Sequence, residues 1–153
     1  MKTIADEKIL NSLVERLRQL SPDTPRRWGT LSPGEMLCHL GDANESVLGT
    51  RIPPGPIPSG APRPVLKWFA LYTAVPWPKG VKTRPGVDPK IDGTRPMDFE
   101  LDRERAIRTL KALAVAEPNT FPAHHFMFGP MSARDWHRWA YRHFAHHLHQ
   151  FGL

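Results

Sequence analysis

The sequence predicts an all-α protein, a four-helix bundle with a long Pro-rich insertion between its second and third long helices. Three observations predict this class. Four segments repeat apolar residues at the spacing of a helix, and three of them begin with a helix-capping pattern. No segment shows the alternation of a half-buried strand. The 153 residues suit one core, so residues 1–153 are expected to form a single domain.

Two long helices are expected in the first fifty residues. The first covers residues 3–20, where Thr3 and Asp6 are expected to form a capping box. The second begins at Ser32, which is followed by a Pro at the first helical position and a Glu at the third. It fades near Gly49. The apolar stripes of these two helices are Ile9, Leu10, Leu13, Leu17 and Leu20, and Met36, Leu40, Ala43 and Val47.

The connection over residues 51–98 holds 11 of the 17 prolines. Long helices are excluded there, because proline removes a backbone donor and clashes with the preceding turn. One apolar run, residues 65–75, is expected to form a short extra helix across the bundle, with an interfacial or dimer patch as the alternative. The remainder, residues 76–96, is expected to be a long loop that covers a functional site or is partly disordered.

The other two long helices are expected over residues 98–117 and 132–151, joined by a turn-rich connection. Pro118 stops the third helix. Ser132 is expected to cap the last helix, with Asp135 three residues further on completing the pattern. The buried side of the third helix is expected to consist of Leu101, Ile107, Leu110, Leu113 and Ala114.

The composition argues against a membrane protein and against a disulfide-stabilised one. No stretch reaches the roughly 20 apolar residues that span a bilayer. The single Cys38 excludes an internal disulfide framework. The first residues are partly acidic and lack an apolar run, so no signal peptide is visible. We therefore expect a cytoplasmic protein without a membrane partner.

The net charge of +6 arises almost entirely in the middle of the chain. Residues 63–95 carry only two acidic residues, Asp88 and Asp92. The basic residues there are Arg63, Lys67, Lys79, Lys82, Arg84, Lys90 and Arg95. No nucleic-acid-reading module accompanies this charge, so no nucleic-acid partner is expected. The segment is interpreted as a solvated basic loop, and attraction of an anionic substrate is the sharper alternative.

Two histidines of the last helix are predicted to be buried together. His143 and His147 are four residues apart, so they lie about 40° apart inside the apolar stripe. Their Cβ atoms would be about 5–6 Å apart, so both rings can reach one ion. His146 and His149 fall on the polar side. That side also carries Asp135, Arg138 and Arg142.

The pair alone leaves two interpretations open. One is a metal site, which suits buried neutral imidazoles but needs a third ligand. The other is a core pair, formed either by two hydrogen-bonded histidines or by one ligand beside a histidine that does not bind. On the second helix, His39 lies at the inner edge of the apolar stripe, whereas Cys38 points the other way and is a poor ligand candidate.

These residues match a known pattern. His39 in a capped second helix, with His143-x-x-x-His147 in the last one, resembles the DinB-like superfamily of metal-binding four-helix bundles. The closer resemblance is to an uncharacterised bacterial branch, and it covers about residues 30–50 and 97–153. The motifs that carry it are the turn His125-Phe126-Met127-Phe128-Gly129, Trp136 before the last helix, and the ending His146-His147-Leu148-His149-Gln150-Phe151-Gly152.

The resemblance implies a cofactor and a chemistry. Members of the superfamily typically bind one divalent ion, often zinc or nickel, through three histidines that correspond to His39, His143 and His147. Three neutral ligands leave the ion an open position, as in catalytic sites. Characterised relatives activate a low-molecular-weight thiol such as mycothiol or bacillithiol there. The resemblance therefore implies a metal-dependent thiol S-transferase, or a related detoxification enzyme, that acts on a small molecule.

Two alternatives stay open. The first is a metal-dependent hydrolase, in which water takes the open position and a carboxylate such as Glu35, Asp42 or Glu45 serves as base. No carboxylate is obvious on the inner faces near the histidines. The second is a non-enzymatic protein with a structural ion or a bound ligand. Homodimer formation is also left open, since it is common in such bundles.

Four further side chains are candidates for supporting the ligands or lining the cavity. Gln150 lies near the ligand face and can accept from a ligating histidine, although helix packing explains it equally well. Ser46 lies beside His39 on the second helix. Trp136 and His125 are simpler to interpret as a core residue and a turn residue.

Overall fold

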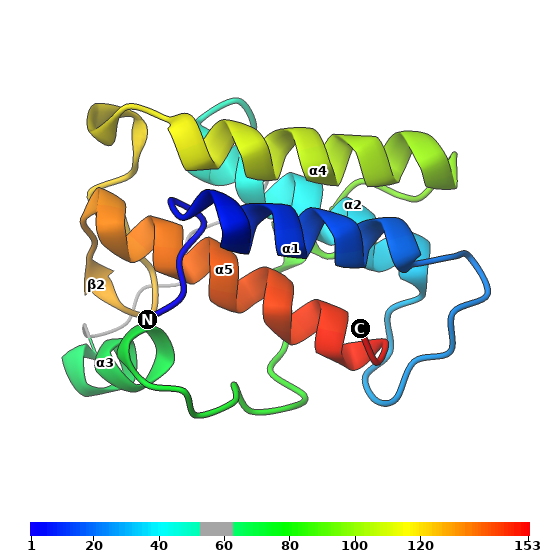
Figure 1. Cartoon of the computed structure of the whole chain (residues 1–153), viewed down its shortest axis with the longest axis horizontal. Coiled ribbons are helices and arrows are strands. Elements are labelled where there is room, and N and C mark those ends of the chain that lie inside the picture. The colour runs from blue at the N-terminus through cyan, green and yellow to red at the C-terminus, as the bar shows by residue number, and fades with distance from the viewer. Residues whose placement is uncertain (53–62) are drawn as a thin grey trace.

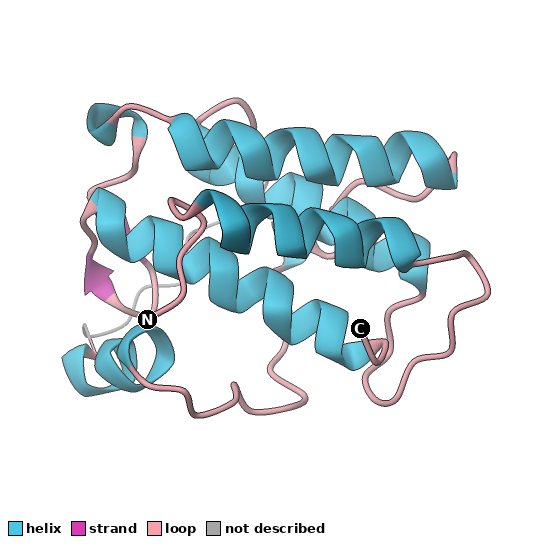
Figure 2. Cartoon of the chain, in the orientation of Figure 1, coloured by secondary structure: helices cyan, strands magenta, loops and turns pink. Residues whose placement is uncertain are grey.

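A computed structural model of the chain describes residues 1–52 and 63–153. These residues are mostly helical, as the all-α class predicts (Figure 2). Their α-helices are α1 (Glu7–Gln19), α2 (Pro33–Leu48), α3 (Pro64–Tyr72), α4 (Phe99–Val115) and α5 (Ala133–Gln150). No helix of this described part is long and apolar enough to cross a bilayer.

The four long helices pack around one apolar core (Figure 1). α2 packs mainly against α4, while α1 contacts both α4 and α5. α3 lies at one end of the molecule, beside α5. Fully buried side chains from all four long helices form the centre of the core, among them Leu17, Leu40, Leu110 and Phe144. α2 and α5 also contact each other directly, which matters for the site below.

Two helices begin as the sequence predicts and one does not. Ser32 and Glu35 form the predicted capping box of α2, and Ser132 and Asp135 form that of α5. The predicted box between Thr3 and Asp6 is wrong. The Asp6 side chain itself caps α1 by accepting from two backbone N–H groups of the first turn, so the helix begins at Glu7.

Leu101 was expected in the core but its side chain is 71% exposed. It lies six residues before Ile107, which puts the two about 120° apart on α4. The buried face of α4 is formed instead by Ala106, Ile107, Thr109, Leu110 and Leu113. Leu101 was assigned to the core because it is apolar. Its position around the axis of α4 instead directs its side chain to solvent.

The Pro-rich connection contains more regular structure than expected. Part of the predicted range 51–98, residues 53–62, lies outside the described residues. The predicted short helix is α3, which ends at Tyr72. The expected loop over residues 76–96 holds a 3₁₀ turn, η1 (Pro85–Val87).

The connection between α4 and α5 also gains short elements that the sequence pattern did not predict. They are a second 3₁₀ turn, η2 (Pro118–Thr120), and the strands β1 (His124–His125) and β2 (Gly129–Pro130), which pair antiparallel. Strands of two residues are too short to produce a visible alternation in the sequence. They fold the segment back on itself and bring His125 close to α5.

Asp42 on α2 is a buried carboxylate that joins three parts of the chain. Its oxygens accept from Arg105 of α4 at 2.6 Å and from the backbone and hydroxyl of Thr94, each at 2.7 Å. Arg51 lies 3.5 Å away. Because the carboxylate is fully buried, these partners replace the water that it loses on folding. Asp42 thereby holds the end of the middle segment against α2.

The segment before Thr94 forms a compact turn that presents the Val87 carbonyl to α2. Val87 N–H donates to the Arg84 carbonyl, and the N–H groups of Asp92 and Gly93 close the turn from the other side. A Cβ at position 93 would lie 2.7 Å from the Asp88 backbone, so only glycine fits there.

We predict that Arg105→Met destabilises the protein by about 3 kcal/mol, because it leaves the buried Asp42 carboxylate without its strongest partner. Urea unfolding measures this loss. Arg108→Met is the matched control, since Arg108 is exposed on the same helix. Equal midpoints for the two variants would contradict the role given to Asp42.

Candidate metal site

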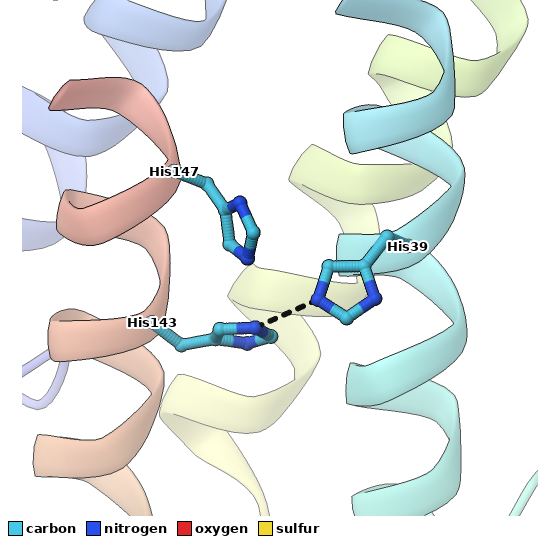
Figure 3. A group of neighbouring side chains, drawn as sticks. All are labelled: His39, His143 and His147. Atoms are coloured by element: carbon cyan, nitrogen blue, oxygen red, sulfur yellow. Dashed lines mark hydrogen bonds between the residues drawn. The ribbon is translucent and has the colours of Figure 1, made fainter. Parts of the chain in front are cut away.

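Three buried histidines from two helices face one another (Figure 3). His39 comes from α2, and His143 and His147 come from α5. Their candidate ligand nitrogens all lie within 4.8 Å of one another, and the Nε2 atoms of His39 and His143 are 2.9 Å apart. The three residues are 5%, 7% and 9% exposed. This group could hold a metal ion.

Two of the three rings are oriented by hydrogen bonds on their outer nitrogens. His39 Nδ1 donates to the Val87 carbonyl at 2.8 Å. His147 Nδ1 donates to Gln150 Oε1 at 3.1 Å. In a neutral imidazole the other nitrogen, Nε2, then keeps its lone pair. Both lone pairs are available to a shared ion, and metal-ligating histidines are usually held in this way.

His143 is held differently. Its Nδ1 is buried and has no hydrogen-bond partner among the described residues. Its Nε2 faces His39 Nε2, and without an ion this 2.9 Å contact is a hydrogen bond in which His143 donates. Tetrahedral zinc ligands would place the nitrogens roughly 3.3 Å apart. The separations of 2.9 Å for one pair and up to 4.8 Å overall bracket that value.

The electrostatics of the site favour neutral rings. Burial lowers the pKa of His39, and it lowers the pKa of His143 and His147 well below the usual 6.5. The neighbouring histidines lower the pKa of His143 further, because a second charge nearby would repel the first. All three are therefore neutral at pH 7, the form that binds metal ions.

A cavity of about 230 Å³ adjoins the three histidines. Its wall is largely apolar and includes Leu66, Trp77, Val81, Phe126, Phe128 and Trp139. No described residue that lines it carries a carboxylate, and its charged residues are Lys82 and Arg84. The cavity thus gives a small molecule access to the histidines and favours an uncharged or anionic one.

The predicted separation of inner and outer histidines on α5 is only partly correct. His149 is exposed, as expected. His146 was placed on the polar side, yet it is half-buried and lines the cavity. Its ring lies 4.8 Å from that of Trp28 and 5.8 Å from that of Trp77, and burial lowers its pKa to about 4. Loops distant in sequence cover this face.

Asp135 and Arg138 were also expected on the polar side, but both are buried. α3 covers them. Asp135 accepts from the Tyr72 hydroxyl and pairs with Lys67 at 2.8 Å, and the Arg138 guanidinium lies over the Tyr72 ring at 4.2 Å. Although burial alone would raise the pKa of Asp135, these partners and Ser132 lower it to about 2.

The four side chains that were predicted to support the ligands or line the cavity do not all lie beside the histidines. Gln150 contacts His147, as described above. Ser46 donates to the Asp42 carbonyl at 2.7 Å, and Trp136 Nε1 donates to the Pro122 carbonyl at 2.8 Å. Both line a second cavity of about 510 Å³, not the one beside the three histidines. His125 lines both cavities.

The three carboxylates considered as general bases are engaged elsewhere. Asp42 and Glu45 pair with Arg105, and Glu35 belongs to the capping box of α2. None of them lines the cavity beside the histidines.

Val87 and Gly29 both help to position the histidines, and the sequence pattern did not identify either of them. Val87 acts through its backbone carbonyl, which any residue would offer. Gly29 has φ +83°, and a Cβ there would lie 2.2 Å from the Gln150 amide nitrogen. Gly29 therefore leaves the space in which Gln150 reaches His147.

Comparison with known proteins gives a family but no activity. A family model described as "Protein of unknown function (DUF1569)" matches residues 6–152, which include all three histidines. Neither the curated proteins nor the solved structures yield a match. The relation to the DinB-like superfamily remains a prediction.

The metal-free protein is predicted to lose stability as the pH falls below about 6.5. There the unfolded chain binds protons that the folded, buried histidines reject, so acidification favours unfolding. His143→Gln removes one such group and should reduce the slope by up to about 1.4 kcal/mol per pH unit. Urea unfolding with a chelator, from pH 7.5 down to about pH 5, measures this slope, and His149→Gln is the control.

A slope that His143→Gln and His149→Gln leave equally unchanged would contradict the assignment of a neutral, buried His143. The comparison uses slopes and not absolute stabilities, so a general destabilisation by either substitution does not affect it.

Proposed function

The chain belongs to the DUF1569 family, and we propose that it is a metal-dependent enzyme. The observation that carries the proposal is the convergence of three buried, neutral histidines beside a cavity. Three neutral ligands leave an ion at least one open position. Zinc or nickel is proposed, because imidazole is a suitable ligand for both ions and members of the DinB-like superfamily often bind one of them. The positions of the ligands on the second and the last helix also match that resemblance.

The proposed reaction is transfer of a low-molecular-weight thiol, of the mycothiol or bacillithiol kind, to an electrophile. When bound, the ion would supply a positive charge that lowers the pKa of a thiol in its open position. The thiol proton then leaves to solvent. The sulfur forms a bond to an electrophilic carbon, and the leaving group departs with its bonding electrons.

The chain's own residues have three tasks in this proposal. Val87 and Gln150 hold two of the ligand rings in the orientation that frees Nε2. The aromatic wall, which includes Trp77 and Trp139, excludes water from a bound substrate. Lys82 at the cavity adds positive charge that attracts an anionic thiol or co-substrate.

The cavity supports this reaction over hydrolysis. Hydrolysis needs a group that takes a proton from water during attack, commonly a carboxylate. No described residue lining the cavity is a carboxylate, and the half-buried His146 is a weak base because burial lowers its pKa to about 4. A thiol is more acidic than water, so it needs less help from a base.

A non-enzymatic role is the second candidate, and one contact favours it. The 2.9 Å contact between His39 and His143 is a satisfied hydrogen bond without any ion. In that case the three histidines are a polar part of the core, or hold an ion that serves only stability. Removal of the ion would then lower the melting temperature with no activity to lose.

We predict that wild type loaded with zinc or nickel and then desalted retains about one ion per chain, whereas His143→Ala retains far less. Elemental analysis measures this. His149→Ala is the matched control, because His149 is exposed on the same helix. Circular dichroism checks that each variant is folded, and His147→Gln provides a second test of the site. Equal metal content in all variants would overturn the proposed site.

The thiol hypothesis has a separate test on the same samples. Metal-loaded wild type should consume bacillithiol or mycothiol in the presence of an electrophilic chloronitrobenzene, and His143→Ala should lose most of that rate. Loss of free thiol over time is the measurement. If metal-loaded wild type neither binds nor consumes either thiol, the transferase proposal fails while the metal site stands.

A further inference from the structure

Arg84 lies where the two cavities meet. It lines both the cavity beside the three histidines and the larger cavity next to it, as do His125, Phe126 and Trp139. Among the described residues, neither cavity is lined by a carboxylate. The junction therefore combines an apolar surface with a guanidinium that no acidic lining residue neutralises.

The Arg84 side chain has an unmet hydrogen-bond donor. Its Nε is buried, and no described residue accepts from it. Buried donors are almost always paired in proteins, and a charged one is especially costly to leave unpaired. Because Arg84 lines both cavities, its guanidinium is within reach of a ligand there, and an anionic group is the partner that it would bind most strongly.

His125 offers a second donor at the same junction. Its Nδ1 accepts from the backbone N–H of Met127 at 3.1 Å, so the proton of the neutral ring is on Nε2. Burial lowers the pKa of His125 to about 4, which keeps the ring uncharged at neutral pH. The ring is stacked against Phe128 with the centroids 4.5 Å apart, which fixes its position.

We infer that the cavity takes a small apolar carboxylic acid, whose carboxylate binds at Arg84 and His125 and whose apolar body lies against the aromatic wall. At the junction of the two cavities, one guanidinium and one neutral donor match the single charge and the two oxygens of a carboxylate, whereas Lys82 and Arg51 each line only one cavity. A phosphate monoester carries up to two charges and more oxygens than these donors satisfy. The inference rests on the proposed function in one respect, which is that this acid is the electrophilic co-substrate.

The turn that begins at Arg84 also contacts His39. The Arg84 carbonyl accepts from Val87 N–H at 3.0 Å, and the Val87 carbonyl accepts from His39 at 2.8 Å. The backbone of Arg84 and the carbonyl that orients His39 therefore belong to one hydrogen-bonded turn, which places the proposed anion site next to the candidate metal site.

The test compares a matched acid and amide. Metal-loaded protein is titrated with 3-phenylpropanoate and 3-phenylpropanamide, followed by calorimetry and by the fluorescence of the cavity tryptophans. We expect wild type to bind the acid roughly 10-fold more tightly than the amide, as a hydrogen bond to a charged group implies. Arg84→Gln should abolish this preference, because it removes the positive charge that distinguishes the acid from the amide.

The control is Arg95→Gln, which removes the same charge from an exposed residue of the same segment. It should change acid binding less than twofold. Acid binding that Arg84→Gln and Arg95→Gln weaken equally would overturn the inference, as would equal affinity of wild type for acid and amide. Tighter binding of phenyl phosphate than of the acid would overturn the carboxylate assignment.

His143→Ala separates this inference from the proposed metal site. If the acid preference persists in His143→Ala and is lost in Arg84→Gln, the carboxylate binds at Arg84, whether or not wild type retains an ion. If the preference is lost in His143→Ala and kept in Arg84→Gln, the carboxylate binds the ion directly. That result overturns the inference and supports the metal site. Elemental analysis of Arg84→Gln should show the metal content of wild type.

Discussion

The buried ion pair between Asp42 and Arg105 determines where much of the middle segment lies. Asp42 accepts from the backbone of Thr94, and the turn before Thr94 supplies the carbonyl that orients His39. His39 is itself on α2, one turn before Asp42. One helix therefore carries a candidate ligand and also the anchor of the loop that orients this ligand. Such an arrangement fixes the ring more firmly than packing alone could.

The basic residues of the middle segment, residues 63–95, have two distinct roles. Part of it is structural, because Lys67 pairs with Asp135 and Lys90 donates to the Thr30 carbonyl at 2.8 Å. Another part, Lys82 and Arg84, faces the cavity. With three uncharged ligands and no acidic wall residue among those described, the positive potential there is not cancelled locally. The plainer interpretation of the sequence, a solvated loop, describes the exposed Lys79 and Arg95 but not Lys67 or Arg84, which are partly buried.

The sequence predicted burial correctly where it depends on the position of a residue around its own helix. It failed where distant segments of the chain cover that helix. Helical phase alone predicted that His143 and His147 are buried and that His149 is exposed. The same reasoning failed for His146, Asp135 and Arg138, because Trp28, Trp77 and α3 cover that face from distant parts of the chain. The Val87 carbonyl could not be foreseen at all, since backbone groups leave no trace in residue identity.

Much of the cavity wall lies outside the two helices that carry the candidate ligands. The three histidines stand on α2 and α5, whereas Trp77, Arg84 and Phe126 belong to connecting segments. Connecting segments tolerate insertion and exchange far better than packed helices do. A change in these connecting segments could therefore alter which molecule the cavity accepts while the three histidines keep their places on the helices.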